Sequence, residues 1–128
     1  MEIALVGTGF IGGVLGRSLS AAGHDVTFGS RHPQDDKVAE GSRARVASVP
    51  EALEGVGVIV LALPGAAVSD FVAENGTALA GKLVIDATNQ MGRPVANARA
   101  ALPPGTRYAR AFNTVGGENM ADPIFNGV

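Results

Sequence analysis

The segment IALVGTGFIGG, residues 3–13, decides the fold of this 128-residue chain. Its first part, Ile3–Val6, is a short apolar run of the kind that forms a buried strand. The glycine-rich stretch GTGFIG, Gly7–Gly12, comes next, and apolar residues at helical spacing then continue to a stop at Gly23. A strand, a tight turn and a helix therefore follow one another, which predicts the first part of a βαβ unit.

The same alternation continues along the chain. Further apolar runs suited to buried parallel strands lie at 26–28, 58–63, 83–85 and 107–112, with a short edge strand at 44–46. Helical intervals are expected at 51–53, 66–79 and 95–102. Strands that alternate with helices predict an α/β fold, here a Rossmann-type doubly wound parallel sheet in three αβα layers.

Size and composition narrow the class of protein. A chain of 128 residues with 46% hydrophobic residues is expected to form one domain, 1–128. Its net charge of -2 predicts no basic surface for nucleic acid or anionic lipid. The absence of cysteine and the two unpaired histidines predict no disulfide and no metal site. The longest apolar run is far below the roughly 18 residues of a membrane span, and no signal peptide is visible, so we expect a cytoplasmic protein.

The two edges of the predicted sheet differ in their connections. The segments after the strands are rich in glycine, asparagine, serine and threonine, namely GTGFIGG, GSRHP, LPGAA, ATNQMGRP and NTVGGEN. The returns from helix to strand are ordinary turns. Because ligands of open α/β sheets lie outside the carboxyl ends of the strands, we expect one ligand cleft along that edge.

The glycine-rich stretch has the spacing of a dinucleotide-binding loop. Gly7 makes the tight turn, Gly9 lets the backbone approach a pyrophosphate, and Gly12 permits close packing of helix on strand. The N-terminus of the following helix then presents N–H groups and a partial positive charge to the phosphates. A glycine-rich turn without a ligand is the alternative.

The stretch HDVTFGSR, His24–Arg31, lacks the acidic residue that would bind the ribose hydroxyls of NAD. Ser30 offers a hydroxyl and Arg31 a permanently charged planar donor, and no carboxylate follows on that turn before Asp35. Lys37 would assist from the next turn. The pattern predicts a site for the 2′-phosphate of NADP, with a preference of about one or two orders of magnitude. An ordinary exposed loop arginine is the alternative.

Other polar residues also follow strands. Asp86, Thr88 and Asn89 come after the strand at 83–85, and Asn113 and Thr114 follow the last strand. They are suited either to holding a nicotinamide or substrate, or to capping their own loops. No nucleophile with an adjacent base emerges, so the catalytic residues are unknown, which fits direct hydride transfer.

Five segments together resemble the NADPH-dependent oxidoreductases of the deazaflavin coenzyme F420. They are ALVGTGFIG, AAGHDVTFGSR, IVLALP, KLVIDATNQ and RAFNTVGGENM, in this order over nearly the whole chain. The resemblance implies hydride transfer between NADP(H) and the deazaflavin, or a flavin-like acceptor. It also implies that the residues holding the dinucleotide are Thr8, Gly9, Phe10, Ile11, Ser30 and Arg31. By the same resemblance, Leu63, Pro64 and Asn89 lie near the ribose and nicotinamide.

Family members continue beyond the AFNT segment, so the resemblance implies that the C-terminal part of the family is absent here. Two other functions stay open at this stage. One is a non-catalytic NADP-binding module that senses cofactor state or scaffolds a partner, and the other is an NADP-dependent reductase of a small metabolite. A chain without the last elements would expose a sheet edge, which leaves homodimerisation open.

Overall fold

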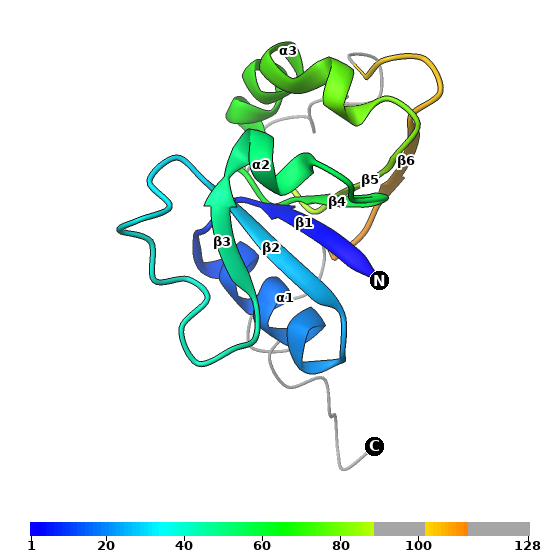
Figure 1. The fold of residues 1–128 in the computed structure, drawn as a ribbon. Coiled ribbons are helices and arrows are strands. Elements are labelled where there is room, and N and C mark those ends of the chain that lie inside the picture. The colour runs from blue at the N-terminus through cyan, green and yellow to red at the C-terminus, as the bar shows by residue number, and fades with distance from the viewer. Residues whose placement is uncertain (89–101, 113–128) are drawn as a thin grey trace.

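The computed structural model describes residues 1–88 and 102–112 of the chain. Its elements, in chain order, are β1 (Glu2–Val6), α1 (Phe10–Ala21), β2 (Asp25–Ser30), β3 (Arg45–Ser48), α2 (Val49–Leu53), β4 (Val58–Leu61), the short 3-10 helix η1 (Gly65–Ala67), α3 (Val68–Leu79), β5 (Leu83–Asp86) and β6 (Arg107–Arg110). The strands form a six-stranded parallel sheet in the order β3-β2-β1-β4-β5-β6 (Figure 1).

This strand order confirms the predicted Rossmann-like α/β fold. The chain runs outward from β1 through β2 to β3, then returns to β4 on the other side of β1. Val6 at the end of β1 pairs with Gly29 of β2 and with Leu61 of β4, so the carboxyl ends of these three strands lie together. The strand order reverses at this point, and open α/β sheets bind their ligands there.

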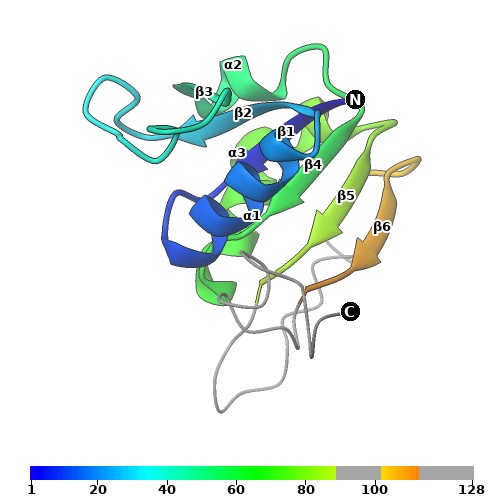
Figure 2. The same ribbon diagram turned by 90° about the horizontal axis from the view of Figure 1, so that it is seen from below.

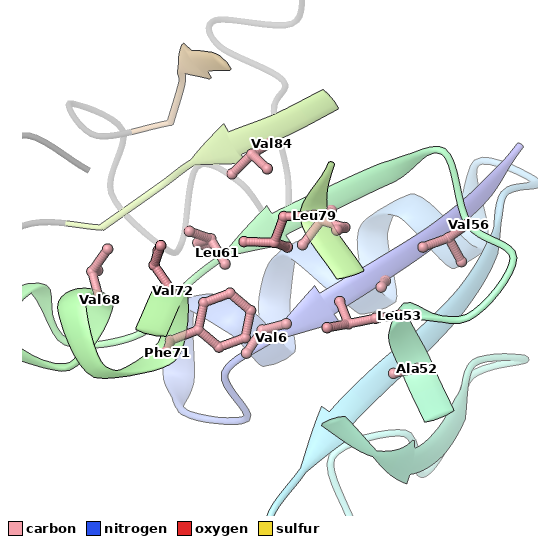
Figure 3. Close-up of a cluster of buried hydrophobic side chains, with 12 residues drawn as sticks. Val6, Ala52, Leu53, Val56, Leu61, Val68, Phe71, Val72, Leu79 and Val84 are labelled. Carbon is pink, nitrogen blue, oxygen red and sulfur yellow. The ribbon is translucent and has the colours of Figure 1, made fainter. Parts of the chain in front are cut away.

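Helices cover both faces of the sheet, with α1 on one face and α2 and α3 on the other (Figures 1 and 2). Alternate residues of each strand serve the two layers. Leu5 belongs to the core on the α1 side together with Phe28. Val6 belongs to the core on the opposite side, with Leu61 of β4 and Phe71 of α3 (Figure 3). A sheet buried on both faces explains why its strands are near-continuous apolar runs.

The predicted elements that fall on described residues are present, with shifted ends. The strand expected at 58–63 ends at Leu61, because the chain turns away at Pro64, which has no N–H for the ladder. The strand expected at 107–112 ends at Arg110, and Phe112 has a positive φ of 67° that no strand accommodates. The helix expected at 66–79 begins as η1 and continues as α3. The helix expected at 95–102 lies outside the described residues, except for its last residue.

A long connection without helix or strand, residues 31–44, joins β2 to β3, and we call it the 31–44 loop. Val38 and Ala39 pack against the core on the α1 side. The guanidinium of Arg17 on α1 donates a hydrogen bond to the Val38 carbonyl at 3.2 Å. These contacts hold the loop against α1. Within the described residues, no helix is both long and apolar enough to cross a membrane.

Candidate dinucleotide-binding site

A cleft of about 1190 Å³ opens at the carboxyl ends of β1, β2 and β4. This is the edge of the sheet at which the sequence predicts a ligand cleft. Its walls come from the glycine-rich turn, the 31–44 loop, the start of α2, the segment after β4, and α3. The lining residues are Val6, Gly7, Thr8, Gly29, Ser30, Arg31, His32, Asp35, Asp36, Lys37, Ser48, Val49, Pro50, Leu63, Pro64, Ala67, Asp70, Phe71, Glu74 and Asn75.

The three glycines of the motif differ in what requires them. Gly7 has a φ of +116°, and a Cβ there would lie 2.5 Å from the Ala62 carbonyl oxygen. A Cβ on Gly12 would lie 2.0 Å from the carbonyl oxygen of Gly7. A Cβ on Gly9 would meet no described atom within 4 Å, and Gly9 has an ordinary φ of -76°. The fold therefore requires glycine at positions 7 and 12, but gives no reason for glycine at position 9.

The N-terminus of α1 is suited to an anion. Gly9 is its N-cap, and among the described residues no side chain caps this end and no acidic residue lies in its first turn. By contrast, α2 begins with a side-chain cap, because the Glu51 N–H donates to the Ser48 hydroxyl oxygen at 3.4 Å. The partial positive charge at the start of α1 is thus not offset by a side chain of the helix itself.

Ser30 lies buried at the end of β2, and its hydroxyl is engaged by the 31–44 loop. The hydroxyl donates to a carboxylate oxygen of Asp36 at 2.9 Å and accepts the N–H of His32 at 3.1 Å. The second carboxylate oxygen of Asp36 accepts the N–H of Val38 at 3.0 Å. Burial on its own would raise the pKa of Asp36, but hydrogen bonds from Ser30, the Val38 N–H and Thr8 outweigh burial and hold this pKa below 3.8.

The contact between Asp36 and Ser30 was not expected from the sequence. Asp35 is the first carboxylate after Ser30 along the chain, but the loop folds back and brings the carboxylate of Asp36 against Ser30. A contact made through an irregular loop has no periodic signature in the sequence, so no pattern was present to reveal it. The basic residues that line the cleft are Arg31 and Lys37, and the acidic residues that line it are Asp35, Asp36, Asp70 and Glu74.

The wall formed by α3 was also missed, although a signal for it exists. Asp70 and Glu74 are four residues apart, as are Phe71 and Asn75, so they share one side of the helix. Phe71 is buried against the core, and the Asn75 side-chain amide donates to its carbonyl oxygen at 3.0 Å. Since the helix after the fourth strand starts at the cleft in this topology, its first two turns were predictable as cleft residues.

The structure brings many of the predicted site residues together. Those that line the cleft are Gly7, Thr8, Ser30, Arg31, Leu63 and Pro64. Gly9, Phe10, Ile11 and Gly12 lie at the start of α1 and are not among the lining residues. The Phe10 side chain is 69% exposed. Asn89 lies outside the described residues, as do Asn113 and Thr114. The roles of all these residues as cofactor contacts stay predictions.

Asp86 and Thr88 at the end of β5 form an internal hydrogen-bond network. One oxygen of the fully buried Asp86 carboxylate accepts the Thr88 N–H at 2.8 Å and the Thr88 hydroxyl. The other accepts the Tyr108 hydroxyl and, at 3.2 Å, the guanidinium of Arg110. Arg110 also donates to the Thr88 carbonyl at 3.1 Å. The loop-capping interpretation of these two residues is therefore observed. In the part of the chain that the structure describes, no cluster of His, Cys, Asp or Glu is arranged to hold a metal ion.

Known proteins share sequence features and the fold of this chain. Residues 2–90 match the model of the protein family described as NADP oxidoreductase, coenzyme F420-dependent. A crystal structure described as an F420-dependent NADP reductase, from an Arthrobacter species, is similar over 96% of this chain and 67% of its own, with 24% identity and a TM-score of 0.76. A hypothetical protein from Sinorhizobium meliloti is similar over 99% of this chain and 68% of its own, with 24% identity and a TM-score of 0.79.

A dehydrogenase is also among the similar structures. The 3-hydroxyisobutyrate dehydrogenase of Mycobacterium tuberculosis, solved with L-serine, has 27% identity and a TM-score of 0.71. The similarity covers 93% of this chain but only 42% of the dehydrogenase. The present chain therefore spans about two thirds of the two structures above and less than half of this dehydrogenase.

Proposed function

Because the chain belongs to the family of coenzyme F420-dependent NADP oxidoreductases, we propose that it binds NADP(H) in the cleft as its redox cofactor. Its described part is a reductase-type Rossmann domain for NAD(P). The second substrate that we propose is a deazaflavin of the coenzyme F420 type, or a related flavin. When bound, the nicotinamide supplies or accepts a hydride, a step that needs no nucleophile from the protein.

The open space around Gly9 is the observation that carries this proposal. A side chain at position 9 would meet nothing in the described structure, so glycine is not explained by the fold. The position is the N-cap of α1, where the N–H groups of the first turn point outward. A pyrophosphate held by these N–H groups would come close to the Gly9 backbone and would leave no room for a Cβ.

The other residues of the cleft would position the rest of the dinucleotide. Arg31 and Lys37 supply positive charge beside the end of β2, which suits the 2′-phosphate of NADP. Leu63 and Pro64 line the cleft after β4 and would exclude water from the part of the cofactor that passes them. The proposal of a deazaflavin acceptor rests on the family and on the similarity to the Arthrobacter protein, which is itself described as an F420-dependent reductase.

Parallel titrations of the purified chain with NADPH and NADH test the cofactor. Tighter binding of NADPH by tenfold or more, which is about 1.4 kcal/mol, supports a 2′-phosphate site. If neither NADPH nor NADH binds, the proposal is contradicted. Oxidation of NADPH by coenzyme F420, by a flavin or by ferric ion then identifies the acceptor. Stoichiometric binding without any oxidation would favour a non-catalytic NADP-binding module.

Substitution of Gly9 by alanine tests the pyrophosphate site directly. We expect Gly9→Ala to keep the thermal stability of the chain and to weaken NADPH binding by at least about tenfold. Gly57→Ala is the matched control, because a Cβ on Gly57 also meets no described atom within 4 Å and Gly57 precedes β4, away from the cleft. Equal NADPH affinity for both variants would show that no ligand approaches Gly9.

A further inference from the structure

We propose that Asp36 is a specificity-determining residue that restrains the preference of the cleft for NADP over NAD. This inference rests on the proposed function, since it concerns the 2′-phosphate of the proposed cofactor. Asp36 holds the hydroxyl of Ser30, the residue at the end of β2 that is predicted to bind this phosphate. The carboxylate therefore competes with the phosphate for the proton of one of its predicted donors.

The hydroxyl group of Ser30 has a single proton to donate. A phosphate near neutral pH is an acceptor, so Ser30 must donate to it. In the structure this one proton goes to the Asp36 carboxylate at 2.9 Å, while an oxygen lone pair of Ser30 accepts the His32 N–H. Ser30 therefore has no proton left for a phosphate unless its bond to Asp36 is broken.

The charge of Asp36 acts in the same direction. The carboxylate lines the same cleft as Arg31 and is hydrogen-bonded to Ser30, so a dianionic phosphate placed at Ser30 is repelled by it and partly loses the benefit of the arginine. The unphosphorylated ribose of NAD carries hydroxyl groups instead, and these are donors that a carboxylate accepts. Asp36 thus disfavours the phosphorylated cofactor and is compatible with the unphosphorylated one.

The position of Asp36 is held by more than one bond. Its second carboxylate oxygen accepts the Val38 N–H at 3.0 Å, and the loop is attached to α1 through the bond from Arg17 to the Val38 carbonyl. The carboxylate is therefore part of the folded loop and not a freely rotating surface group. A phosphate that recruits Ser30 must compete with this arrangement each time it binds.

The test compares NADPH and NADH affinities of the wild-type chain, Asp36→Ala and Asp36→Asn. We expect each substitution to tighten NADPH by at least fivefold, roughly the strength of a weak hydrogen bond, and not to tighten NADH. In a chain that already carries Ser30→Ala, the fold-gain in NADPH affinity from Asp36→Ala should be less than half of its value in the wild-type chain. An unchanged ratio of the two affinities in both variants would make Asp36 only an anchor of the loop and overturn the proposal.

Two further variants separate this effect from general charge. Glu40→Gln removes one negative charge from the same loop outside the cleft, and we expect no change in either affinity. Asp35→Asn removes a cleft charge that is not hydrogen-bonded to Ser30, and we expect a clearly smaller gain in NADPH affinity. Equal gains from Asp35→Asn and Asp36→Asn would overturn the role of the hydroxyl. If the wild-type chain binds neither nucleotide, the proposed function fails, whereas binding with an unchanged selectivity in the Asp36 variants refutes only this inference.

Discussion

Arg31 is the single residue whose charge is best placed to distinguish NADPH from NADH. It follows Ser30 at the end of β2 and lines the cleft. A charge-assisted hydrogen bond contributes about 1.5 to 3 kcal/mol, and exposure reduces this figure. We therefore expect Arg31→Ala to weaken NADPH binding by about tenfold and to leave NADH binding within about twofold, as measured by titration of both nucleotides.

Arg43→Ala is the control for this prediction, because Arg43 is exposed on the same loop and does not line the cleft. Equal losses in the two variants would mean that the loop acts only through its overall charge. Equal losses of NADPH and NADH in Arg31→Ala would place the guanidinium at a part common to both nucleotides, and would remove it from the 2′-phosphate site.

Single residues were predictable from the sequence where their role is local. Gly7 and Gly12 were assigned from spacing alone, and their surroundings show why, since a Cβ at either position would meet the backbone within 2.5 Å. Asp36 was not predictable, because its contact with Ser30 depends on the path of an irregular loop. Spacing therefore identifies the glycines that the turn requires, whereas only the folded loop reveals the contact between Asp36 and Ser30.

At the scale of elements, a buried carboxylate on β5 links this strand to β6. Asp86 pairs with Arg110 across the two strands and accepts the hydroxyl of Tyr108, which extends from β6 to the same oxygen. Burial of Tyr108, the hydrogen bond to Asp86 and the nearby charge of Asp86 raise the pKa of the phenol above 10.0, although Arg110 opposes this rise. The folded chain therefore holds the phenolic proton more tightly than the unfolded chain.

A stability change at alkaline pH follows from this shift. The stabilisation is complete below the ordinary phenol pKa of 10.0 and is lost as the pH rises through the higher folded value. Tyr108 is the only tyrosine and the chain has no tryptophan, so near-ultraviolet absorbance reports this phenol alone. We expect its ionisation midpoint to lie above 10.0 in the native chain and to return to about 10.0 in denaturant.

Two variants control the tyrosine prediction. Tyr108→Phe should remove the absorbance change and cost about 1 kcal/mol of unfolding free energy at neutral pH. Asp86→Asn should lower the midpoint of Tyr108, because the charge that favours the protonated phenol is removed, and circular dichroism would show that the variant is folded. A native midpoint at or below 10.0 would contradict the network as described.

The elements themselves were predictable from the sequence, but their ends were not. Buried apolar runs identified the strands because a parallel sheet buries both faces of each strand. The end of β4 before Pro64 and the end of β6 before Phe112 depend instead on local backbone geometry. The short strand β3 also begins and ends later than the apolar residues suggested, since its position is fixed by pairing with β2.

At the scale of the whole molecule, the topology follows from alternation and handedness. Parallel strands joined by helices pack with right-handed crossovers, so the reversal of strand order beside β1 and the cleft at that point could be expected before any coordinates. The charge balance inside the cleft could not be expected in this way, because acidic residues from the 31–44 loop and from α3 meet there only after folding. The site therefore joins parts of the chain that are distant in the sequence.

A ligand that joins these parts should stabilise the whole fold and protect its walls unequally. NADPH at roughly 100 times its dissociation constant should add about 2.7 kcal/mol to the free energy of unfolding, seen as a higher melting temperature. Hydrogen exchange should slow most in the glycine-rich turn before α1 and in the 31–44 loop, which line the cleft, and least in β6 at the far edge of the sheet. Protection confined to β5 and β6 would place the nucleotide elsewhere, and protection spread evenly over the sheet would mean that binding acts only through global stability.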